Sequence, residues 1–383
     1  MAPYAGFDAM LTKPNARRAR RRSRTAAATI HDVAARAGVS VATVSRVLNG
    51  KQLVREETSR HVMKAVKALH YAPNVAARSL SIRRSQTVGI VLPEVHGEYF
   101  SEVIRGIDLA ARAERYHILV SGSHSDPREM MEVVATMRGR VDGLVIMAPD
   151  VTLAPLNELR ARELPIVFLN AAGKSGDAIT IDNYSGARVM MQFLQDLGHT
   201  RIAFVRGPEH NADARERLRG YRQLMREVAA APDTLECDGD FTEESGFAAG
   251  RTIAAMTTRP TAVFAANDSM AVGVLAAFSA AGVKVPGTIS VAGFDDIPIA
   301  RYVVPALTTM RVDMAELGRR AFSLLLDAIT SPAAHRARRE RVAATLIVRD
   351  SCAKANLVPQ VITRPHRAAR GKRSGRSESG EMA

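Results

Sequence analysis

The stretch "TIHDVAARAGVSVATVSRVLNG", residues 29–50, decides how this chain of 383 residues is interpreted. Thr29 can cap a first helix whose third residue is Asp32, and Gly38 supplies the positive φ with which helices commonly end. Ser40 can then cap a second helix. Two short helices joined by a tight glycine turn predict a helix-turn-helix, a unit whose second helix can enter the major groove of DNA.

The second predicted helix has two distinct faces. Val44, Val47 and Leu48 point one way and form its packing face. Residues at spacings of three and four form the other face, namely Val41, Ala42, Ser45, Arg46 and Asn49. Arg46 and Asn49 can hydrogen-bond to base edges or phosphates, and Val41 and Ala42 can contact thymine methyl groups. This outward face therefore favours DNA reading over a generic three-helix packing unit.

A third helix follows in "EETSRHVMKAVKALHY", residues 56–71. Val62, Val66 and Leu69 recur at helical spacing and form its packing face. Arg55 precedes this helix, in a place where a side chain with a capping oxygen would be favoured. The sequence thus predicts a compact three-helix head with a weakly capped third helix.

Charge is distributed unevenly along the chain, whose net charge is +14. Residues 1–28 contain seven Lys or Arg and one Asp or Glu, and residues 29–85 contain ten basic and three acidic residues. Residues 86–353 contain 29 basic and 33 acidic residues, and residues 354–383 contain seven basic and two acidic residues. A basic front end on a nearly neutral body indicates a polyanionic partner at one end only. The arginine run "RRARRRSR" is expected to add non-specific phosphate contacts.

Several protein classes are excluded by composition. The two cysteines, Cys237 and Cys352, offer neither metal-ligand spacing nor a disulfide framework, which is typical of a reducing cytosol. No run of eighteen apolar residues occurs, and the basic N-terminus lacks the apolar core of an export signal. We therefore expect a cytoplasmic bacterial protein, associated with the nucleoid when bound to DNA, with no membrane partner, no metal and no cofactor.

From residue 86 onward, apolar runs alternate with helical periods. Examples of the runs are "TVGIVLP", "VDGLVIMAP", "LPIVFLN", "RIAFVRGP", "TAVFAAND" and "ISVAGFDD". Continuous apolar strands between amphipathic helices predict parallel sheets covered on both faces. About 265 residues of this pattern exceed one ordinary sheet, so we expect an α/β body of two doubly wound lobes.

These motifs together resemble the LacI/GalR family of bacterial transcription regulators. The resemblance rests on residues 29–50, on "YAPNVAARSL", and on "TVGIVLP", "VDGLVIM", "LGHTRIAFVRGP", "ANDSMAVGVLAAF", "VAGFDDIP" and "LTTMRVDMAELGRRA". It covers roughly residues 29–353. The resemblance implies a helix-turn-helix head, a hinge helix and a two-lobed body like that of periplasmic binding proteins. Arg55 and the two basic ends depart from the family pattern.

The expected domain organisation follows from these boundaries. Residues 1–28 form a disordered basic tail, residues 29–72 the DNA-binding head, and residues 73–85 a hinge helix and linker. Residues 86–353 form the effector-binding and dimerisation domain, and residues 354–383 a second disordered basic tail. Leucine heptads are missing after residue 353, so a tetramer through a C-terminal coiled coil is not expected.

The segment "PNVAARSL" offers about eight residues of helix, too few to be stable alone in water. It should therefore order only when it is bound. The resemblance implies that two such helices, one per subunit, lie in the DNA minor groove, where Leu80 wedges into a base step beside Ala77 and Arg78. Packing of Leu80 onto the body is the alternative. The complete predicted DNA-contacting set is Thr29, Ser40, Val41, Ala42, Thr43, Ser45, Arg46, Asn49, Ala77, Arg78 and Leu80.

Polar and aromatic residues stand near the ends of the predicted strands, where ligands bind in such sheets. Tyr99 and Phe100 follow the first strand and Ser123 the second. The resemblance implies that Arg217, Phe241, Asn267 and Asp295 line an effector pocket between the lobes. Charged groups can clasp sugar hydroxyls while an aromatic ring covers the apolar face of the sugar.

We therefore predict a homodimeric, sequence-specific DNA-binding regulator, most often a repressor in this family, that binds a near-palindromic operator. A small-molecule effector controls it, with a sugar favoured and a nucleoside or purine possible. An enzyme is not expected, because nucleophile elbows, phosphate loops and metal-ligand clusters are missing from the sequence. One alternative is a sugar-binding protein of a transport system. Another is an architectural DNA protein without an effector.

Overall fold

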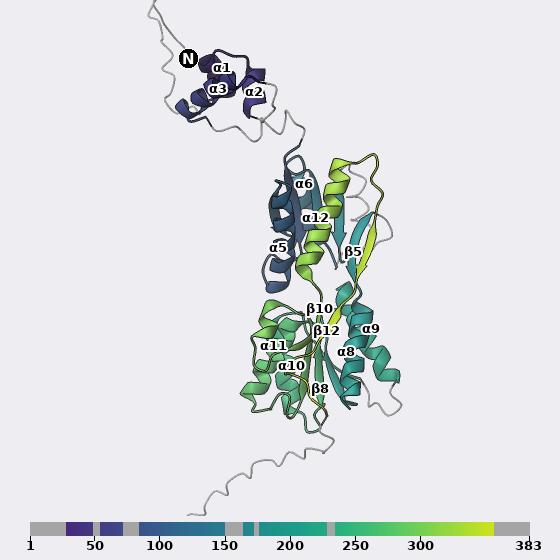
Figure 1. Ribbon diagram of the computed structural model, residues 1–383. Coiled ribbons are helices and arrows are strands. Elements are labelled where there is room, and N and C mark those ends of the chain that lie inside the picture. The colour runs from purple at the N-terminus through teal and green to yellow at the C-terminus, as the bar shows by residue number, and fades with distance from the viewer. Residues whose placement is uncertain are drawn as a thin grey trace, which may run out of the picture. The chain divides into compact units, whose positions relative to one another are not determined.

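The computed structural model describes residues 28–48, 54–71, 84–149, 164–171, 176–227 and 234–355 (Figure 1). The chain divides into two compact units, Met1–Arg83 and Arg84–Ala383, and each is treated by itself. Four of the predicted DNA-contacting residues lie outside the described residues, namely Asn49, Ala77, Arg78 and Leu80. Nearly all of both predicted basic tails, and nearly all of the predicted hinge segment, lie outside them as well.

The described residues of the first unit form three short helices, α1 (Ile30–Ala37), α2 (Val41–Leu48) and α3 (Glu56–Ala68). Thr29 and Asp32 form a capping box at the start of α1, in which the backbone N–H of each is accepted by the side chain of the other. Gly38 ends α1 in the left-handed conformation, with φ 64°. Local sequence chemistry therefore sets both ends of the first helix.

Five small apolar side chains form the centre of this unit. They are the buried residues Val33, Ala34, Val44, Val62 and Ala65. Val66, Leu69, Val47 and Leu48 pack around them, as their helical spacing predicts. Val41 packs there too, although we expected it on the outward face of α2. Because Val41 opens the helix next to the turn, it lies at the boundary between the two faces.

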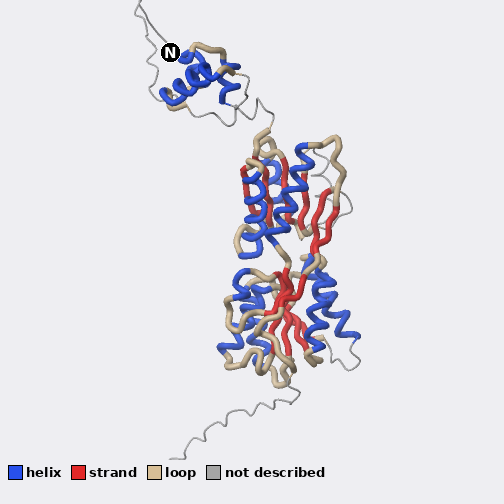
Figure 2. The backbone as a smooth tube through the Cα atoms, in the orientation of Figure 1, coloured by secondary structure: helices blue, strands red, loops and turns tan. Residues whose placement is uncertain are grey.

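The second unit has two lobes, each built around a six-stranded sheet (Figures 1 and 2). The first sheet is parallel throughout, in the order β11-β5-β4-β3-β1-β2. Its strands are β1 (Thr87–Leu92), β2 (His117–Gly122), β3 (Gly143–Met147), β4 (Ile166–Leu169), β5 (Asp177–Ile181) and β11 (Arg339–Val342). Its helices are α5 (Glu98–Ala113), α6 (Pro127–Met137) and α12 (Met314–Thr330).

The second sheet has the order β12-β10-β9-β8-β6-β7 and is parallel except for β12, which runs antiparallel to β10. Its strands are β6 (Ile202–Val205), β7 (Leu235–Cys237), β8 (Ala262–Ala265), β9 (Ser290–Asp295), β10 (Thr308–Arg311) and β12 (Thr345–Ile347). Its helices are α8 (Asn183–Asp196), α9 (Ala212–Glu227), α10 (Glu243–Ala255), α11 (Asp268–Ala280) and the 3-10 turn η1 (Pro298–Arg301). Figure 1 shows α8 and α9 on one face of this sheet and α10 and α11 on the other.

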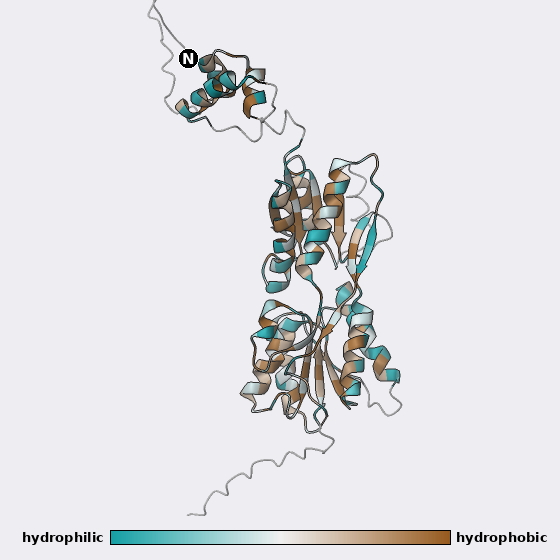
Figure 3. Ribbon diagram, in the orientation of Figure 1, coloured by the Kyte–Doolittle hydropathy of each residue, from teal (hydrophilic) through white to brown (hydrophobic). Residues whose placement is uncertain are grey.

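Alternation along the strands fills both faces of each sheet. On β1, Ile90 packs in the cluster that contains Val103 and Ile107 of α5, while its neighbour Val91 packs in the cluster that contains Met130 of α6. Figure 3 shows many strands of both lobes as hydrophobic, whereas β11, at the edge of the first sheet, is largely hydrophilic. The predicted doubly wound α/β architecture is confirmed.

The helices α5 and α12 approach each other very closely. A Cβ atom added at Gly106 would lie 1.9 Å from the carbonyl oxygen of Ala315, and one at Gly318 would lie 2.3 Å from that of Val103. Only glycine allows this backbone contact. It joins α12, late in the sequence, to the first lobe.

The chain crosses between the lobes three times. It leaves the first lobe after β5, returns after β10 to form α12 and β11, and crosses again to add β12 to the second lobe. Each lobe therefore contains a late segment of the chain, α12 and β11 in the first lobe and β12 in the second. Among the described residues, none of the helices combines the length and apolarity required to cross a bilayer.

Candidate effector site and DNA-binding head

The outward surface of α2 presents the residues predicted to read DNA. Ala42 and Arg46 are exposed, and Thr43 and Ser45 are partly exposed. The hydroxyl oxygen of Ser40 accepts the backbone N–H of Thr43 at 3.2 Å, so Ser40 caps the helix as its position predicts. The helix thus offers one long cation and several small groups, a combination that suits entry into a groove.

Thr29 and Ser40 are exposed, yet their hydroxyl groups are engaged in caps. The Thr29 hydroxyl donates to the Asp32 carboxylate at 2.8 Å, and the Ser40 hydroxyl lies 2.9 Å from that of Thr43. Exposed N–H groups at the start of a helix are also a common place for a phosphate oxygen to bind. In the structure, the hydroxyl groups of Thr29 and Ser40 stabilise the starts of α1 and α2.

A cavity of about 450 Å³ opens between the two lobes of the second unit, and its wall contains residues of both. Six of the seven predicted effector residues lie on this wall, namely Tyr99, Phe100, Arg217, Phe241, Asn267 and Asp295. Ser123 is not brought to the cavity. It is buried and its hydroxyl donates to the carbonyl of Leu92 at 3.2 Å. Ser125, two residues later, lines the cavity instead.

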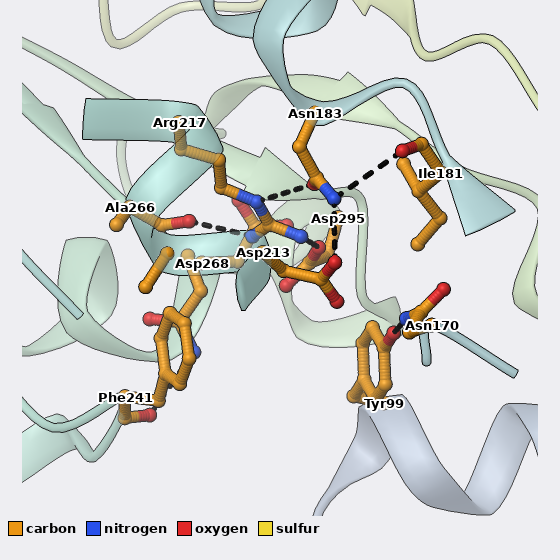
Figure 4. A network of polar contacts seen from close by, with 12 residues as sticks. Tyr99, Asn170, Ile181, Asn183, Asp213, Arg217, Phe241, Ala266, Asp268 and Asp295 are labelled. Carbon is orange, nitrogen blue, oxygen red and sulfur yellow. Dashed lines mark hydrogen bonds and ion pairs between the residues drawn. The ribbon is translucent and has the colours of Figure 1, made fainter. Parts of the chain in front are cut away.

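Arg217 is the centre of a buried polar network, shown in Figure 4. Its Nε donates to Asn183 Oδ1 at 2.8 Å, and its Nη1 donates to the carbonyl of Ala266 at 2.6 Å. Its Nη2 lies 2.9 Å from Asp295 Oδ1. The guanidinium carbon also lies 3.9 Å from the centre of the Phe294 ring. Arg217 is 2% exposed, so this network holds the cation in one orientation.

Asp295 ends β9 in a strained backbone conformation, with φ 113°. Burial raises the pKa of Asp295 to about 6, and the Arg217 guanidinium opposes that rise. Within the described chain, Asp295 Oδ1 is paired with Arg217 but makes no hydrogen bond of good geometry. A buried acceptor in this state is suited to a donor from a ligand.

Phe241 and Asn267 act as a pair on the second lobe. Asn267 Nδ2 donates to the carbonyl of Phe241 at 3.0 Å, and Asn267 Oδ1 accepts the backbone N–H of Met270 at the start of α11. Phe241 has φ 74°, an unusual value for an aromatic residue. The amide of Asn267 is thus already committed, and its effect on the cavity is to hold the Phe241 backbone.

Sequence reasoning missed Asn170, which follows β4 in the first lobe. Its Nδ2 donates to Tyr99 Oη at 2.9 Å, while its Oδ1 is buried without a hydrogen-bond partner in the described chain. It has φ 52° and is 3% exposed. The quoted run "LPIVFLN" ends at this residue, so its position after a buried strand was the available signal.

Asn183 and Asp213 were missed as well. Asn183 Nδ2 donates to Asp213 Oδ1 at 2.8 Å, and Asp213 lines the cavity. Asn183 stands at the first residue of α8, directly after a chain crossing between the lobes. Nothing in its local sequence distinguishes it from an ordinary helix-capping residue.

Two further carboxyl groups near the cavity have structural roles. Asp268 is fully buried and accepts from the Thr309 hydroxyl at 2.6 Å and the Ile297 N–H at 3.0 Å. Burial, followed by the nearby Asp295, raises the pKa of Asp268. Asp296 is paired with Arg311 at 2.6 Å and with Arg349. Both residues therefore join separate segments of the second lobe to one another.

Tyr99 is held neutral at the cavity wall. Burial raises the pKa of its hydroxyl, and the negative charges of Asp213 and Asp295 raise it further. The ring of Tyr99 packs edge-on against Phe100, with ring centres 5.2 Å apart. In the described part of the chain, the structure contains no group of three or more residues able to hold a metal ion.

A helix-turn-helix head joined to a two-lobed body with a polar cavity between its lobes defines a DNA-binding regulator controlled by a small molecule. The sequence model of "Bacterial regulatory proteins, lacI family" matches residues 29–74, and that of "Periplasmic binding protein-like domain" matches residues 191–352. The chain belongs to the LacI family of bacterial regulatory proteins. It is a transcription regulator and not an enzyme.

Known relatives agree with this assignment. The ribose operon repressor of Escherichia coli strain K12 is 38% identical over 311 residues, which span 80% of this chain and 94% of the relative. The lac repressor dimer bound to operator and to the anti-inducer ONPF has a TM-score of 0.78 at 29% identity, covering 85% of this chain and 99% of that one. A LacI-family regulator of Enterococcus faecalis V583 with bound ribose has a TM-score of 0.64 at 27% identity, covering 70% of this chain and 100% of that one.

Proposed function

We propose that this protein is a homodimeric repressor whose affinity for a near-palindromic operator is controlled by a sugar bound between the two lobes. The observation that carries the proposal is the cavity itself. Its wall holds the buried pair of Arg217 and Asp295 from one lobe and the Tyr99–Asn170 pair from the other. A ligand that bonds to both pairs changes the angle between the lobes.

The effector acts on DNA binding through the segment that joins the units. We propose that residues 29–72 form the head, residues 73–85 the hinge and linker, and residues 86–353 the effector-binding and dimerisation domain, with basic tails at both ends. Ala77, Arg78 and Leu80 of each subunit enter the minor groove, while the α2 surface with Arg46 and Asn49 reads the major groove. Lobe closure moves the two hinges and alters their fit to DNA.

A second copy of the chain supplies the other half-site. The turn around η1 exposes large apolar side chains, with Tyr302 75% and Val304 94% exposed and Ile299 beside them. Apolar groups exposed together favour an interface. The operator-bound lac repressor dimer supports the same assembly. A protein that binds bacterial DNA acts in the cytoplasm, and we propose that location for this chain.

The sugar is favoured for chemical and comparative reasons. Orphaned buried acceptors beside a fixed cation match the hydroxyl groups of a sugar, and the Phe241 and Phe100 rings can cover its apolar face. The ribose operon repressor and the ribose-bound regulator favour a pentose. Nucleosides and purines are the competing effectors.

The test is a thermal-shift screen of sugars, nucleosides and purines on the full-length protein. A sugar that raises the melting temperature of the wild-type protein should leave the melting temperatures of the Arg217→Ala and Phe100→Ala variants unchanged. Arg226→Ala is the matched control, because this arginine is exposed on the same helix away from the cavity. Stabilisation by purines alone, or by sugars equally in the Arg217 and Phe100 variants, would contradict the proposal.

A further inference from the structure

Residues 84–86 stand where the predicted hinge and linker segment joins the body, and a distant carboxylate holds them. Asp142, which directly precedes β3, accepts the backbone N–H of Ser85 at 2.6 Å and the Ser85 hydroxyl at 2.9 Å, both at Oδ1. Its Oδ2 accepts the backbone N–H of Gln86 at 2.9 Å. One side chain therefore receives three hydrogen bonds from two consecutive residues.

The last turn of α12 holds the same segment from a second element. Arg84 Nη2 donates to the carbonyl oxygen of Ile329 at 3.2 Å. Carbonyl groups at the end of a helix lack a partner within the helix, and a cation is favoured there by the helix dipole. A Cβ atom added at Gly143, the first residue of β3, would lie 3.1 Å from the Ile329 side chain, so the two anchoring elements are neighbours. We call the contacts of Asp142 and Ile329 with residues 84–86 the linker clamp.

The clamp fixes one backbone conformation at the start of the body. Gln86 has φ 51°, which for a residue other than glycine is costly and persists only where the surroundings enforce it. Its N–H is bound to Asp142, and its carbonyl oxygen accepts the N–H of His117 at 2.9 Å. The Ser85 hydroxyl oxygen also accepts the N–H of Thr87 at 3.2 Å. The backbone on both sides of Gln86 is thus tied to the body.

Two neighbouring strands lead from the clamp to the effector cavity. β1 and β3 pair in parallel, with Thr87 opening β1 and Asp142 directly preceding β3. At their other ends, Pro93 after β1 and Met147 of β3 line the cavity. Strands of this length span roughly 20 Å. The clamp and the cavity wall therefore lie at opposite ends of the same pair of buried strands.

The helices α5 and α12 provide a second connection. The first turn of α5 places Tyr99 and Phe100 on the cavity wall. Further along α5, Gly106 meets the backbone of α12 at Ala315, and Figure 1 shows the two helices side by side. The last turn of α12 then supplies the carbonyl that holds Arg84. Both halves of the linker clamp thus belong to elements connected to the cavity.

We propose that the linker clamp is the point at which the effector state of the body reaches the hinge, and that Asp142 is a positioning residue for operator binding. This rests on the proposed function, because it specifies which contacts of the body carry the control of DNA affinity. A linker that starts from a fixed backbone must follow a movement of β1, β3 or α12. A linker that starts from a free backbone absorbs that movement in its own dihedral angles. Asp142 is not among the residues that line the cavity, so it acts without touching the effector.

The experiment compares the wild-type protein with Asp142→Ala, both at full length. The DNA is a duplex selected by the wild-type protein from a random pool, and the compounds are ribose, glucose, inosine and hypoxanthine. Fluorescence anisotropy gives the factor by which a compound changes DNA affinity, which is typically about 5- to 150-fold for an allosteric effector. In Asp142→Ala this factor should fall below about one third of its wild-type value. Calorimetry should show that the affinity of the DNA-free protein for the compound changes by no more than about twofold.

Two further variants separate positioning from stability. Asp142→Asn keeps one acceptor oxygen and should give an intermediate factor, and it carries the test alone if the alanine variant does not fold. Ser290→Ala is the matched control, because it removes two buried hydrogen bonds to the backbone of Ala353 in the second lobe and should keep the wild-type factor. Hydrogen exchange of the Gln86 amide should be faster in both Asp142 variants, which reports release of the clamp.

Each other outcome is decisive. A wild-type factor in the Asp142 variants despite faster exchange at Gln86 would overturn the inference and leave effector control of DNA binding intact. Unchanged exchange at Gln86 would show that Asp142 does not clamp the linker. An equal loss of the factor in Ser290→Ala would assign the effect to general destabilisation and overturn the inference as well. If none of the four compounds changes the DNA affinity of the wild-type protein, the proposed effector control fails, and this inference fails with it.

Discussion

At the scale of single residues, the cavity concentrates backbone strain. Ser125, Asn170, Phe241 and Asp295 all line it, and all have positive φ although none is a glycine. Such conformations cost on the order of 1–3 kcal/mol each, and they persist only where the surroundings enforce them. In this protein the strain directs the Asn170 and Asp295 side chains toward the polar network at the cavity.

The titration of Asp295 gives the cavity a pH dependence. With a pKa of about 6, Asp295 is ionised at pH 7.5 and largely protonated at pH 5. If the effector bonds to the carboxylate, its affinity should fall about tenfold between these pH values. Calorimetric titration at both values measures this fall. The Asp295→Asn variant should bind the effector with the same affinity at pH 7.5 and pH 5. Equal affinities of the wild-type protein at these two pH values would contradict the prediction.

The ionisation of Asp295 also affects the stability of the fold, but stability changes with pH in the direction opposite to effector affinity. The folded-state pKa of Asp295 exceeds the unfolded value of about 3.9, so the folded chain binds more protons between about pH 4 and pH 6. The contribution of this group to stability therefore falls as the pH rises through that window. Asp268, whose pKa is also raised by burial, acts in the same direction.

At the scale of elements, the head depends on caps because its helices are short. Isolated helices of eight residues are unstable in water, and α1 and α2 each have eight. The capping box at Thr29 and the left-handed Gly38 fix α1, while Ser40 fixes α2. In contrast, Arg55 makes no side-chain cap at the start of α3. That longer helix depends on packing through Val62 and Ala65 instead.

Removing the first cap should loosen the head without disturbing the body. Thr29→Ala is expected to cost about 1 kcal/mol of head stability, since it removes one half of the capping box. Hydrogen exchange of the α1 amides in the full-length protein measures this loss. Thr29→Ser keeps the hydroxyl and should retain most of the protection. Equal exchange in the wild-type protein and the alanine variant would show that the cap is dispensable.

The hinge segment is the element on which our proposed control depends. Leu80→Ala should weaken operator binding by at least about tenfold, because the smaller side chain cannot hold a base step open. Fluorescence anisotropy with an operator duplex measures the affinity. Leu80→Met should lose less, because it keeps a long apolar side chain. If the alanine variant binds the operator like the wild-type protein, then Leu80 is not a wedge.

At the scale of the whole molecule, the effector and the operator DNA are proposed to change each other's binding affinity through one conformational equilibrium. The lobes are joined by three chain crossings, and α12, which follows the second of them, packs tightly on α5 of the first lobe. We propose that ligand binding between the lobes is transmitted along this continuous backbone. Thermodynamic linkage requires reciprocity: the factor by which the effector changes the affinity for DNA equals the factor by which DNA changes the affinity for the effector.

This reciprocity can be measured directly. An effector that weakens operator binding by a coupling energy of about 1–3 kcal/mol should itself bind about 5- to 150-fold more weakly to the protein–operator complex. Titration of the effector into free protein and into the complex gives the two affinities. Equal values would exclude allosteric control of DNA binding by that compound, whatever its affinity.

Much of this protein could be predicted from local sequence because the relevant forces are local. The caps at Thr29, Gly38 and Ser40 act within one helical turn. The strands β1, β3 and β9 are almost entirely buried, as their continuous apolar sequences predict. Residues that end or follow strands, such as Asp295 at the end of β9 and Tyr99 in the helix after β1, could be located because parallel sheets bind ligands at their carboxyl ends.

Only the tertiary structure decided how the two lobes share the chain and which side chains meet in the cavity. Short strands such as β11 and β12 have weak patterns and become strands by pairing with distant partners. Asn170 and Asn183 acquire their roles through contacts with Tyr99 and Arg217, which lie 71 and 34 residues away. Local sequence determined the elements and the family, while long-range contacts determined the site, because a site made by two lobes has no local signature.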